Sequence, residues 1–220
     1  MRLRKKPWIK DEITTYENLV VMEPELYKGK WKEWFKNEHP IHVELGTGKG
    51  NFITTLAEKH PECNFIGVEV REEVLIAAVR KAAKKGLKNI AFLWVNINKI
   101  DEMFAEDELS RLFLNFSDPW PKSRHAKRRL THRDFLSKYK LILKQGQEIH
   151  LKTDNEKLFE FSLNEFSDAG FRLKNITFDL HHSDFEEEKA VMTEYEQKFV
   201  NLGMKIYRAE AIYLPRTNGK

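Results

Sequence analysis

The chain has 220 residues, which is long enough for one domain with a full hydrophobic core, and its hydrophobic content of 41% excludes a disordered protein. The net charge of +4 is mildly basic, so the placement of the charges is more informative than their sum. The single cysteine, Cys63, excludes an internal disulfide and suits a reducing compartment. The basic N-terminus has no apolar run behind it, and no stretch approaches the length of a membrane span, so we expect a soluble, cytoplasmic protein.

The elements predicted along the chain alternate between strands and helices. Residues 1–40 have weak periodicity and are interpreted as a basic N-terminal arm, containing Arg2, Arg4, Lys5 and Lys6, followed by an irregular lead-in. The expected strands cover residues 41–45, 64–70, 89–97, 111–117 and 147–154, and two tail strands are expected at 171–182 and 205–216. The expected helices cover residues 51–60, 72–86, 132–146 and 155–170. This order predicts an α/β fold with a parallel, doubly wound sheet.

A glycine-rich turn, VELGTGKG, joins the first expected strand to the first expected helix. Gly46, Gly48 and Gly50 form a G-x-G-x-G pattern, which lets the backbone turn tightly and approach a ligand, and which differs from the G-x-G-x-x-G pattern of dinucleotide enzymes. Glu69 follows at the end of the second strand, where a carboxylate accepts hydrogen bonds from ribose hydroxyls. Glu44 stands just before the turn, where it would repel a pyrophosphate and suit a cation or an amino group.

The third expected strand ends at Asn96, where an amide is suited to hydrogen-bond an adenine edge. A ligand with an adenosine, a positive centre and no phosphate is S-adenosylmethionine. The pattern VELGTGKG, with VEV ending the second strand, resembles the Rossmann-like methyltransferases. That resemblance implies a mainly parallel seven-stranded sheet with an antiparallel C-terminal hairpin and helices on both faces. Residues 41–220 would then form the S-adenosylmethionine-dependent methyltransferase domain.

A stiff corner and a basic run follow the fourth expected strand. Asp118 lies at the same sheet edge as the glycine turn, Pro119 and Pro121 fix their φ angles, and Trp120 offers a flat face for stacking. The basic residues that follow are Lys122, Arg124, His125, Lys127, Arg128, Arg129 and Arg133. Such a run is compatible with a solvated helix start. Beside a methyl-donor pocket, however, it favours a nucleic acid, bound in a salt-sensitive way.

The segment DPWPKSRHAKRR, together with VELGTGKG, HLKTDN and MTEYEQKF, resembles the bacterial tRNA (guanine-N7)-methyltransferase family over most of the chain. The resemblance implies methylation of a guanine in the tRNA variable loop. It implies S-adenosylmethionine contacts from Glu44, Glu69, Asn96 and Asp118. It implies contacts to the substrate guanosine from Lys122, Asp154, Thr193, Glu194, Tyr195 and Glu196, and an RNA-interaction region that contains Arg124, His125, Lys127, Arg128 and Arg129. Asn96 is a departure, because the family commonly has aspartate there.

This chemistry does not need a general base, because guanine N7 carries a lone pair and no proton. The enzyme has to align the reactants and to stabilise the cationic product. Asp118 and Asp154 end neighbouring strands and are the candidates for that stabilisation, with Asp118 as the catalytic residue. Trp120 and Tyr195 are candidates for stacking on a displaced base, although packing in the core is the alternative for both.

Other functions stay open at this stage. A methyltransferase for a small molecule or a protein, and an RNA-binding protein without activity, are the two main alternatives. A nicotinamide oxidoreductase is disfavoured by Glu44 and by the glycine spacing. Asp179, His181, His182 and Asp184 are not expected to form a metal site, because a strand would place only some of them on one face. No obligate protein partner is evident, and the chain is expected to be a monomer or a homodimer.

Overall fold

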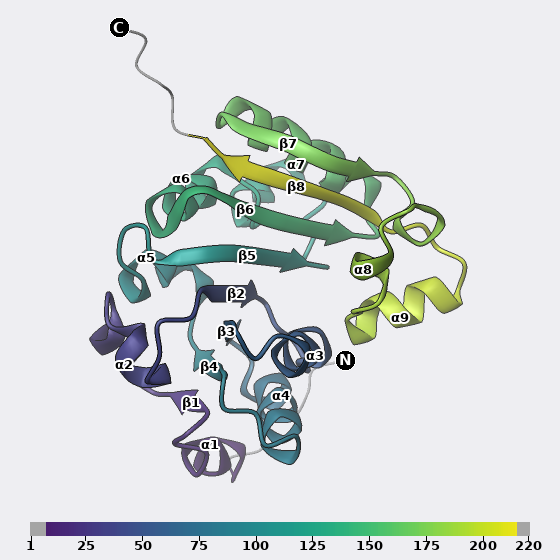
Figure 1. Cartoon of the computed structure of the whole chain (residues 1–220). Helices are drawn as coiled ribbons and strands as arrows, with labels where there is room; N and C mark the ends of the chain where they lie inside the picture. The colour runs from purple at the N-terminus through teal and green to yellow at the C-terminus, as the bar shows by residue number, and fades with distance from the viewer. Residues whose placement is uncertain (1–7, 215–220) are drawn as a thin grey trace, which may run out of the picture.

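The computed structural model of the chain describes residues 8–214, without the side chains of residues 187 and 188. The expected basic arm therefore lies outside the described residues. Within them, one mixed sheet is surrounded by helices, as Figure 1 shows. Successive residues of a strand face opposite sides, and both sides are packed: Phe65 and Phe92 enter one apolar cluster, whereas Ile66 and Leu93 enter the other. No helix within residues 8–214 combines the length and the apolar character needed to cross a membrane.

The sheet of the described residues has the strand order β1-β4-β3-β2-β5-β6-β8-β7. The pairs from β1 to β6 are parallel, and β8 is antiparallel to both β6 and β7. The predicted Rossmann-like arrangement with an antiparallel C-terminal hairpin is confirmed, with one short edge strand more than the seven expected. The strands are β1 (Val20–Val21), β2 (Ile41–Leu45), β3 (Asn64–Glu69), β4 (Ile90–Trp94), β5 (Leu109–Asn115), β6 (Leu143–Thr153), β7 (Phe171–Thr177) and β8 (Tyr207–Tyr213).

Four long helices lie near their predicted positions, and shorter ones are added between them. The helix expected at 132–146 ends at Ile142, because residues 143–146 already belong to β6. The α-helices are α1 (Trp8–Thr14), α2 (Trp31–Phe35), α3 (Asn51–Lys59), α4 (Glu72–Lys84), α5 (Ile100–Met103), α6 (Arg133–Ile142), α7 (Glu156–Asp168), α8 (Glu186–Lys189) and α9 (Glu194–Asn201). The short 3₁₀-helices are η1 (Pro24–Tyr27), η2 (Ile97–Lys99), η3 (Ser123–Arg128) and η4 (Leu180–His182). Asn155 caps α7 by accepting from the amide of Leu158, as its position in the sequence indicates.

Residues 8–40 have more regular structure than the irregular lead-in that we expected. Helices α1 and α2, strand β1 and η1 all lie in this part of the chain. Ile9 and Ile13 of α1 are buried in the same apolar cluster as residues of α4. Trp31 of α2 is fully buried, stacks on Phe104 with 5.4 Å between the ring centroids, and donates from Nε1 to the carbonyl of Met103. These elements are short, so their order comes from packing and not from a repeated pattern.

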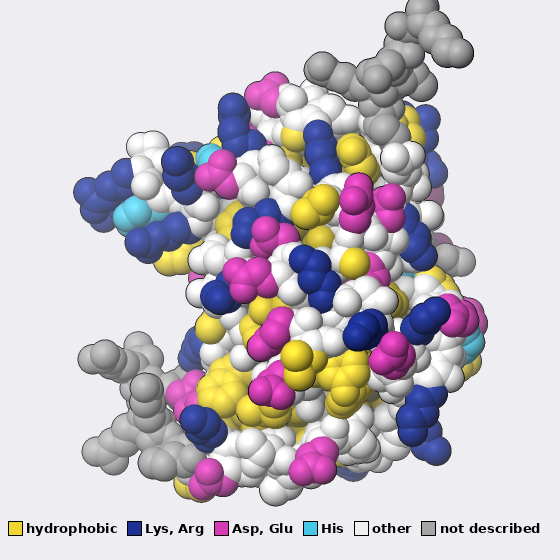
Figure 2. All heavy atoms as spheres, turned by 90° about the vertical axis from the view of Figure 1, so that its left-hand side faces the viewer, with side chains coloured by type: hydrophobic (Ala, Val, Ile, Leu, Met, Phe, Trp, Pro, Cys, Tyr) yellow, Lys and Arg dark blue, Asp and Glu magenta, His cyan; other side chains and the backbone are white. Residues whose placement is uncertain are grey.

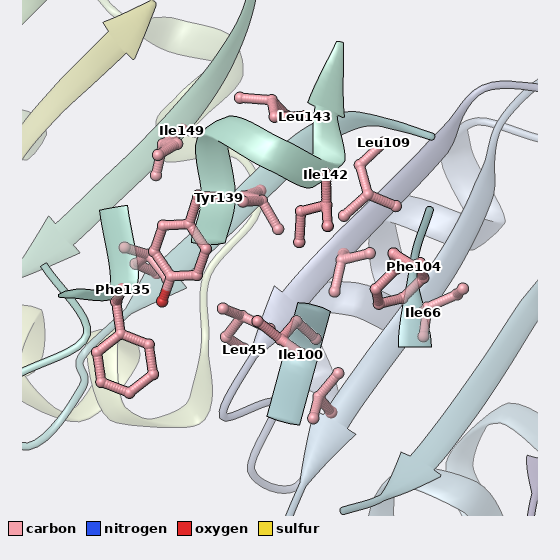
Figure 3. Packing of buried hydrophobic residues seen from close by; sticks show 14 of the residues in the cluster. Leu45, Ile66, Ile100, Phe104, Leu109, Phe135, Tyr139, Ile142, Leu143 and Ile149 are labelled. Atoms are coloured by element: carbon pink, nitrogen blue, oxygen red, sulfur yellow. The ribbon is translucent and has the colours of Figure 1, made fainter. Parts of the chain in front are cut away.

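Helix α6 shows how the main apolar cluster is built. Phe135, Tyr139 and Ile142 recur at helical spacing and are buried on one face of α6. Figure 3 shows Ile142 beside Leu109, and all three side chains belong to the apolar cluster that contains Leu109 and Ile149. This packing holds β5 and β6 side by side, and the carboxyl ends of these strands carry the candidate site.

The C-terminal insertion, residues 178–206, connects β7 to β8 and contains η4, α8 and α9. Figure 1 shows α8 and α9 on the side of the molecule to which the arrowheads of β5 and β6 point. The insertion therefore reaches the sheet edge where ligands bind in open α/β proteins.

Candidate functional site

A cavity of about 530 Å³ lies at the carboxyl ends of β2, β3 and β5. Its walls are the glycine turn, the ends of these strands and the first turn of α9. The lining residues are Glu44, Gly46, Thr47, Gly48, Lys49, Glu69, Arg71, Val74, Asn115, Phe116, Thr193, Glu194, Tyr195 and Lys198. The structure thus brings together the glycine turn, two acidic residues and part of the MTEYEQKF segment, as the sequence predicts for a ligand pocket.

The three glycines of the turn have different surroundings. Gly46 and Gly48 have φ angles of 80° and 58°, and a Cβ on either would meet no atom within 4 Å. Both line the cavity, so their backbone is open to a ligand. Gly50 is buried away from the cavity, and a Cβ there would lie 2.5 Å from the Cβ of Ala78. Gly50 therefore permits the close approach of α3 to α4. The glycine pattern in the sequence does not distinguish this packing role from a role in ligand binding.

Glu44 forms the floor of the cavity. It is 1% exposed, and its two oxygens accept hydrogen bonds from the Thr47 hydroxyl at 2.7 Å and from the Asn115 amide nitrogen at 2.8 Å. Both donors are neutral groups. Burial therefore dominates and raises the pKa of Glu44 to about 7, although the two hydrogen bonds oppose the shift. A cationic group placed beside Glu44 would stabilise the ionised carboxylate.

Glu69 joins the glycine turn to the end of β3. One oxygen accepts from the Gly48 amide at 3.2 Å, and the other accepts from the amides of Val70 and Arg71 at 3.0 Å. These backbone donors hold the carboxylate in one orientation at the cavity wall. Asn96 lies elsewhere: it is exposed, does not line the cavity, and its amide oxygen caps η2 by accepting from the amide of Asn98.

The N-terminal turn of α9 forms the opposite wall. Glu194 pairs with Lys81 of α4 at 2.6 Å, and its other oxygen accepts from the Asn51 amide at 3.4 Å. Thr193 caps α9 by accepting from the amide of Glu196. Tyr195 is 61% exposed and packs against Phe199 at 5.3 Å, so its ring lies at the rim of the cavity and not in the core.

Glu196 has a different environment from its neighbours. Its side chain is fully buried and pairs with Lys152 of β6 at 3.3 Å, while His181 Nε2 lies 3.0 Å from the same oxygen. Lys152 Nζ also donates to the carbonyl of Val191 at 3.3 Å. These contacts attach the C-terminal insertion to the sheet. Glu196 therefore positions α9 at the cavity, but its side chain does not line the cavity.

The corner after β5 is braced by its own basic residues. Phe116 and Trp120 have φ angles of 50° and 41°, an unfavourable conformation for side chains other than glycine. Arg129 donates to the carbonyls of Pro119 and Trp120 at 3.1 and 3.0 Å, and the guanidinium of Arg128 lies 4.8 Å from the Trp120 ring. This bracing supports a conformation that the residues would not adopt alone.

The remaining predicted residues lie around this corner and outside the cavity lining. Asp118 is exposed, and Asp154 is half-buried at the end of β6. Lys122, Arg124, Lys127 and Arg128 are exposed, whereas Trp120, His125 and Arg129 are half-buried. Figure 2 shows a projection of the surface, at its upper left, on which Lys, Arg and His side chains gather. The basic segment 122–129 therefore exposes several cations to solvent, whereas Arg129 stabilises the corner through its hydrogen bonds to Pro119 and Trp120.

The two histidines of the segment 179–184 have different acidic partners. His182 contacts Asp179 at 3.0 Å, and His181 contacts Glu196. In the described part of the chain, the group with metal-ligand proximity is instead Glu148, His150 and Glu210. Glu148 is paired with Arg111 at 2.6 Å, and Glu210 with Arg208. The positive charges of Arg111 and Arg208 thus already compensate the negative charges of the two glutamates, which does not favour a metal ion there.

The sequence analysis missed seven lining residues: Thr47, Lys49, Arg71, Val74, Asn115, Phe116 and Lys198. Asn115 could have been predicted from the sequence, because it ends β5 at the same sheet edge as Asp118. Lys152 also had a signal, since a lysine within an otherwise apolar strand pattern needs a buried partner. No local signal marks Lys198, which reaches the cavity only because α9 folds back onto the sheet.

Known proteins resemble the chain over nearly its whole length. Residues 38–209 match the sequence profile of a family described as "Putative methyltransferase". A tRNA (guanine-N(7)-)-methyltransferase of Brevibacillus brevis is 53% identical over 211 residues, covering 96% of this chain and 98% of that protein. A protein of the same name from Halalkalibacterium halodurans is 50% identical over 218 residues, covering 99% of this chain and 97% of that protein.

Solved structures share the fold at low sequence identity. The 16S rRNA methyltransferase KamB has a TM-score of 0.63 and 14% identity, covering 85% of this chain and 94% of that one. A SAM-dependent methyltransferase from Aquifex aeolicus has a TM-score of 0.55 and 18% identity, covering 94% of this chain and 98% of that one. These similarities concern the fold alone.

Proposed function

Because the chain belongs to the family of tRNA (guanine-N(7)-)-methyltransferases, we propose that it transfers a methyl group from S-adenosylmethionine to N7 of a guanine in the tRNA variable loop. The observation that carries the proposal is the buried carboxylate of Glu44, held by neutral donors in a glycine-walled cavity beside a basic corner. A cofactor with an ammonium group and no phosphate suits this floor. A polyanionic substrate suits the corner.

The residues of the cavity fit S-adenosylmethionine. Glu44 would take the ammonium of its amino-acid part, and burial strengthens that interaction. Glu69, oriented by three backbone amides, would accept from the ribose hydroxyls. Gly46 and Gly48 leave their backbone open to the cofactor. The buried carboxylate of Glu44 at the floor of the cavity disfavours a dinucleotide pyrophosphate there.

When bound, the cofactor supplies an electrophilic methyl group on a sulfonium. Guanine N7 has a free lone pair, so no residue has to remove a proton before the in-line attack. The protein contributes alignment, which removes a large entropic barrier, and negative charge near the cationic product. Asp118 and Asp154 follow the adjacent strands β5 and β6 and are the candidates for this charge.

The substrate side of the proposal uses the surface around the corner. The exposed cations of segment 122–129 would bind RNA phosphates. Tyr195 has an exposed ring at the cavity rim and is suited to stack on a displaced guanine. Trp120 is less free for this role, because Arg128 covers one face of its ring and His125 contacts it edge-on at 5.8 Å.

Methyl transfer from labelled S-adenosylmethionine to unmodified tRNA, followed by mapping of the labelled base, tests the proposal. We expect the label on N7 of a variable-loop guanine. Label on another base would keep the enzyme class and overturn the substrate. Absence of transfer with retained cofactor binding would indicate a small-molecule or protein acceptor, and absence of both would indicate an RNA-binding protein without activity.

The role of Asp118 is tested by Asp118→Ala. Turnover at saturating tRNA should fall by about 100-fold, the usual effect of losing a preorganised electrostatic group, whereas the Kd for tRNA should change little. Glu25→Ala removes an exposed carboxylate of η1 as the control. Equal turnover of the Asp118 variant and the unsubstituted protein would remove Asp118 from the chemical step.

A further inference from the structure

Asn115 has one half of its amide group without a partner. The residue ends β5, is 6% exposed and lines the cavity. Its Nδ2 donates to Glu44 Oε1 at 2.8 Å. Its Oδ1 is buried and accepts no hydrogen bond from any group in residues 8–214. Burying an unsatisfied acceptor is unfavourable, so this oxygen indicates a donor that comes from a ligand.

The orientation of the amide follows from the chemistry of its neighbour. Beside a cationic ligand Glu44 is ionised, and an ionised carboxylate can only accept hydrogen bonds. Asn115 then has to direct its NH₂ group to Glu44, which leaves its Oδ1 as the free atom. Thr47 donates to the second oxygen of Glu44 at 2.7 Å and fixes the carboxylate. Two acceptors, one of them charged, therefore lie together in the cavity lining, a pair that matches a group with several N–H donors and a positive charge.

We propose that Asn115 is a further cofactor-binding residue, whose Oδ1 accepts a hydrogen bond from the ammonium of the S-adenosylmethionine amino-acid part alongside Glu44. This inference rests on the proposed function. The N1–H and N2 donors of guanine offer similar chemistry. The depth of the pair favours the cofactor, because Glu44 and Asn115 are buried behind the glycine turn, whereas Tyr195 marks an exposed rim where a base attached to RNA would enter.

Calorimetric binding of two ligands to three forms of the full chain tests the proposal. S-adenosylhomocysteine carries the ammonium, whereas 5′-deoxy-5′-methylthioadenosine has the same adenosine and thioether without the amino-acid part. Asn115→Leu removes both halves of the amide. Thr47→Val is the matched control, because it removes the other neutral donor to Glu44 and leaves the Asn115 amide oxygen in place.

For Asn115→Leu, we expect binding of S-adenosylhomocysteine to weaken by about tenfold or more, as for loss of a hydrogen bond to a charged group. Thr47→Val should weaken it less than Asn115→Leu does, because valine removes one donor to Glu44 and leaves the Asn115 acceptor for the ammonium in place. Both variants should bind methylthioadenosine as the unsubstituted protein does, which also shows that they are folded.

Several outcomes would overturn the assignment. Equal losses in the two variants would mean that Asn115 acts only by holding Glu44. Equal losses for the two ligands would mean a general disturbance of the cavity. Unchanged S-adenosylhomocysteine binding together with a raised KM for tRNA would place the oxygen at the guanine edge. Failure of the unsubstituted protein to bind S-adenosylhomocysteine would instead contradict the proposed function itself.

Discussion

Glu44 is 1% exposed, yet its hydrogen bonds come from the neutral side chains of Thr47 and Asn115. Its pKa is raised to about 7 because burial disfavours the ionised form more than these donors favour it. The folded pKa exceeds the ordinary value of 4.5, so the contribution of Glu44 to stability is full below pH 4.5 and is lost as the pH rises to about 7. A cationic ligand reverses this preference by favouring the carboxylate.

Cofactor binding should therefore depend on pH near neutrality. S-adenosylhomocysteine should bind about tenfold more weakly at pH 6 than at pH 8, because most of the Glu44 side chains have to lose a proton before they hold the ammonium at the lower pH. Calorimetric titration over this range measures the effect.

Glu44→Gln is the control for this pH profile, because glutamine has the same shape and does not titrate. The variant should bind more weakly at pH 8, with an affinity that no longer changes between pH 6 and 8. A profile as steep as that of the unsubstituted protein would assign the titration to another group.

At the scale of elements, two ion pairs among the described side chains attach the C-terminal insertion to the rest of the molecule, and they differ in depth. Lys152 and Glu196 have side chains that are 2% and 0% exposed. Lys81 and Glu194 have side chains that are 30% and 39% exposed. Both pairs tie α9 to the sheet and its helices, but only the first is shielded from water and salt.

Lys152→Met should be strongly destabilising, because it leaves the Glu196 carboxylate buried without its lysine. The free energy of unfolding, measured with urea, should fall by about 3–5 kcal/mol. Lys81→Met breaks the exposed pair and should cost at most about 1 kcal/mol. The double variant Lys152→Met/Glu196→Gln should be more stable than Lys152→Met alone, and a further loss of stability in the double variant would contradict the pairing.

At the scale of the whole molecule, a small net charge of +4 is distributed unevenly. Exposed cations gather in segment 122–129, which follows β5. Arg128 and Arg129 are partly used to brace the corner, so the cations most available to RNA phosphates are those without such contacts.

Removing two of these cations should reduce the salt dependence of tRNA binding. For Arg124→Ala/Lys127→Ala, the slope of log K against log salt should become shallower by about 1–2, because each lost phosphate contact removes about 0.7–0.9. Lys144→Ala, at the start of β6 and hence at the opposite end of that strand, should leave the slope unchanged. Filter binding over a range of salt concentrations measures both slopes, and equal slopes for all three proteins would exclude segment 122–129 from the interface.

Features that depend on a short stretch of chain were predictable from the sequence. The alternation of strands and helices, the cap at Asn155, and the glycine turn with Glu44 and Glu69 follow from periodicity and from residue chemistry at fixed spacing. The sheet edge that carries the cavity follows as well, because parallel strands bring their carboxyl ends together.

Contacts between distant residues were decided only by the tertiary structure. Asn115 reaches Glu44 across 71 residues of sequence, and Lys152 reaches Glu196 across 44. The same holds for Gly50, which is confined by Ala78 and not by a ligand. Periodicity reports which face of an element is buried, but it does not report which element covers that face. The sequence therefore predicts the sheet edge and the chemistry of the turn, whereas packing determines which side chains line the cavity and which ones hold its walls.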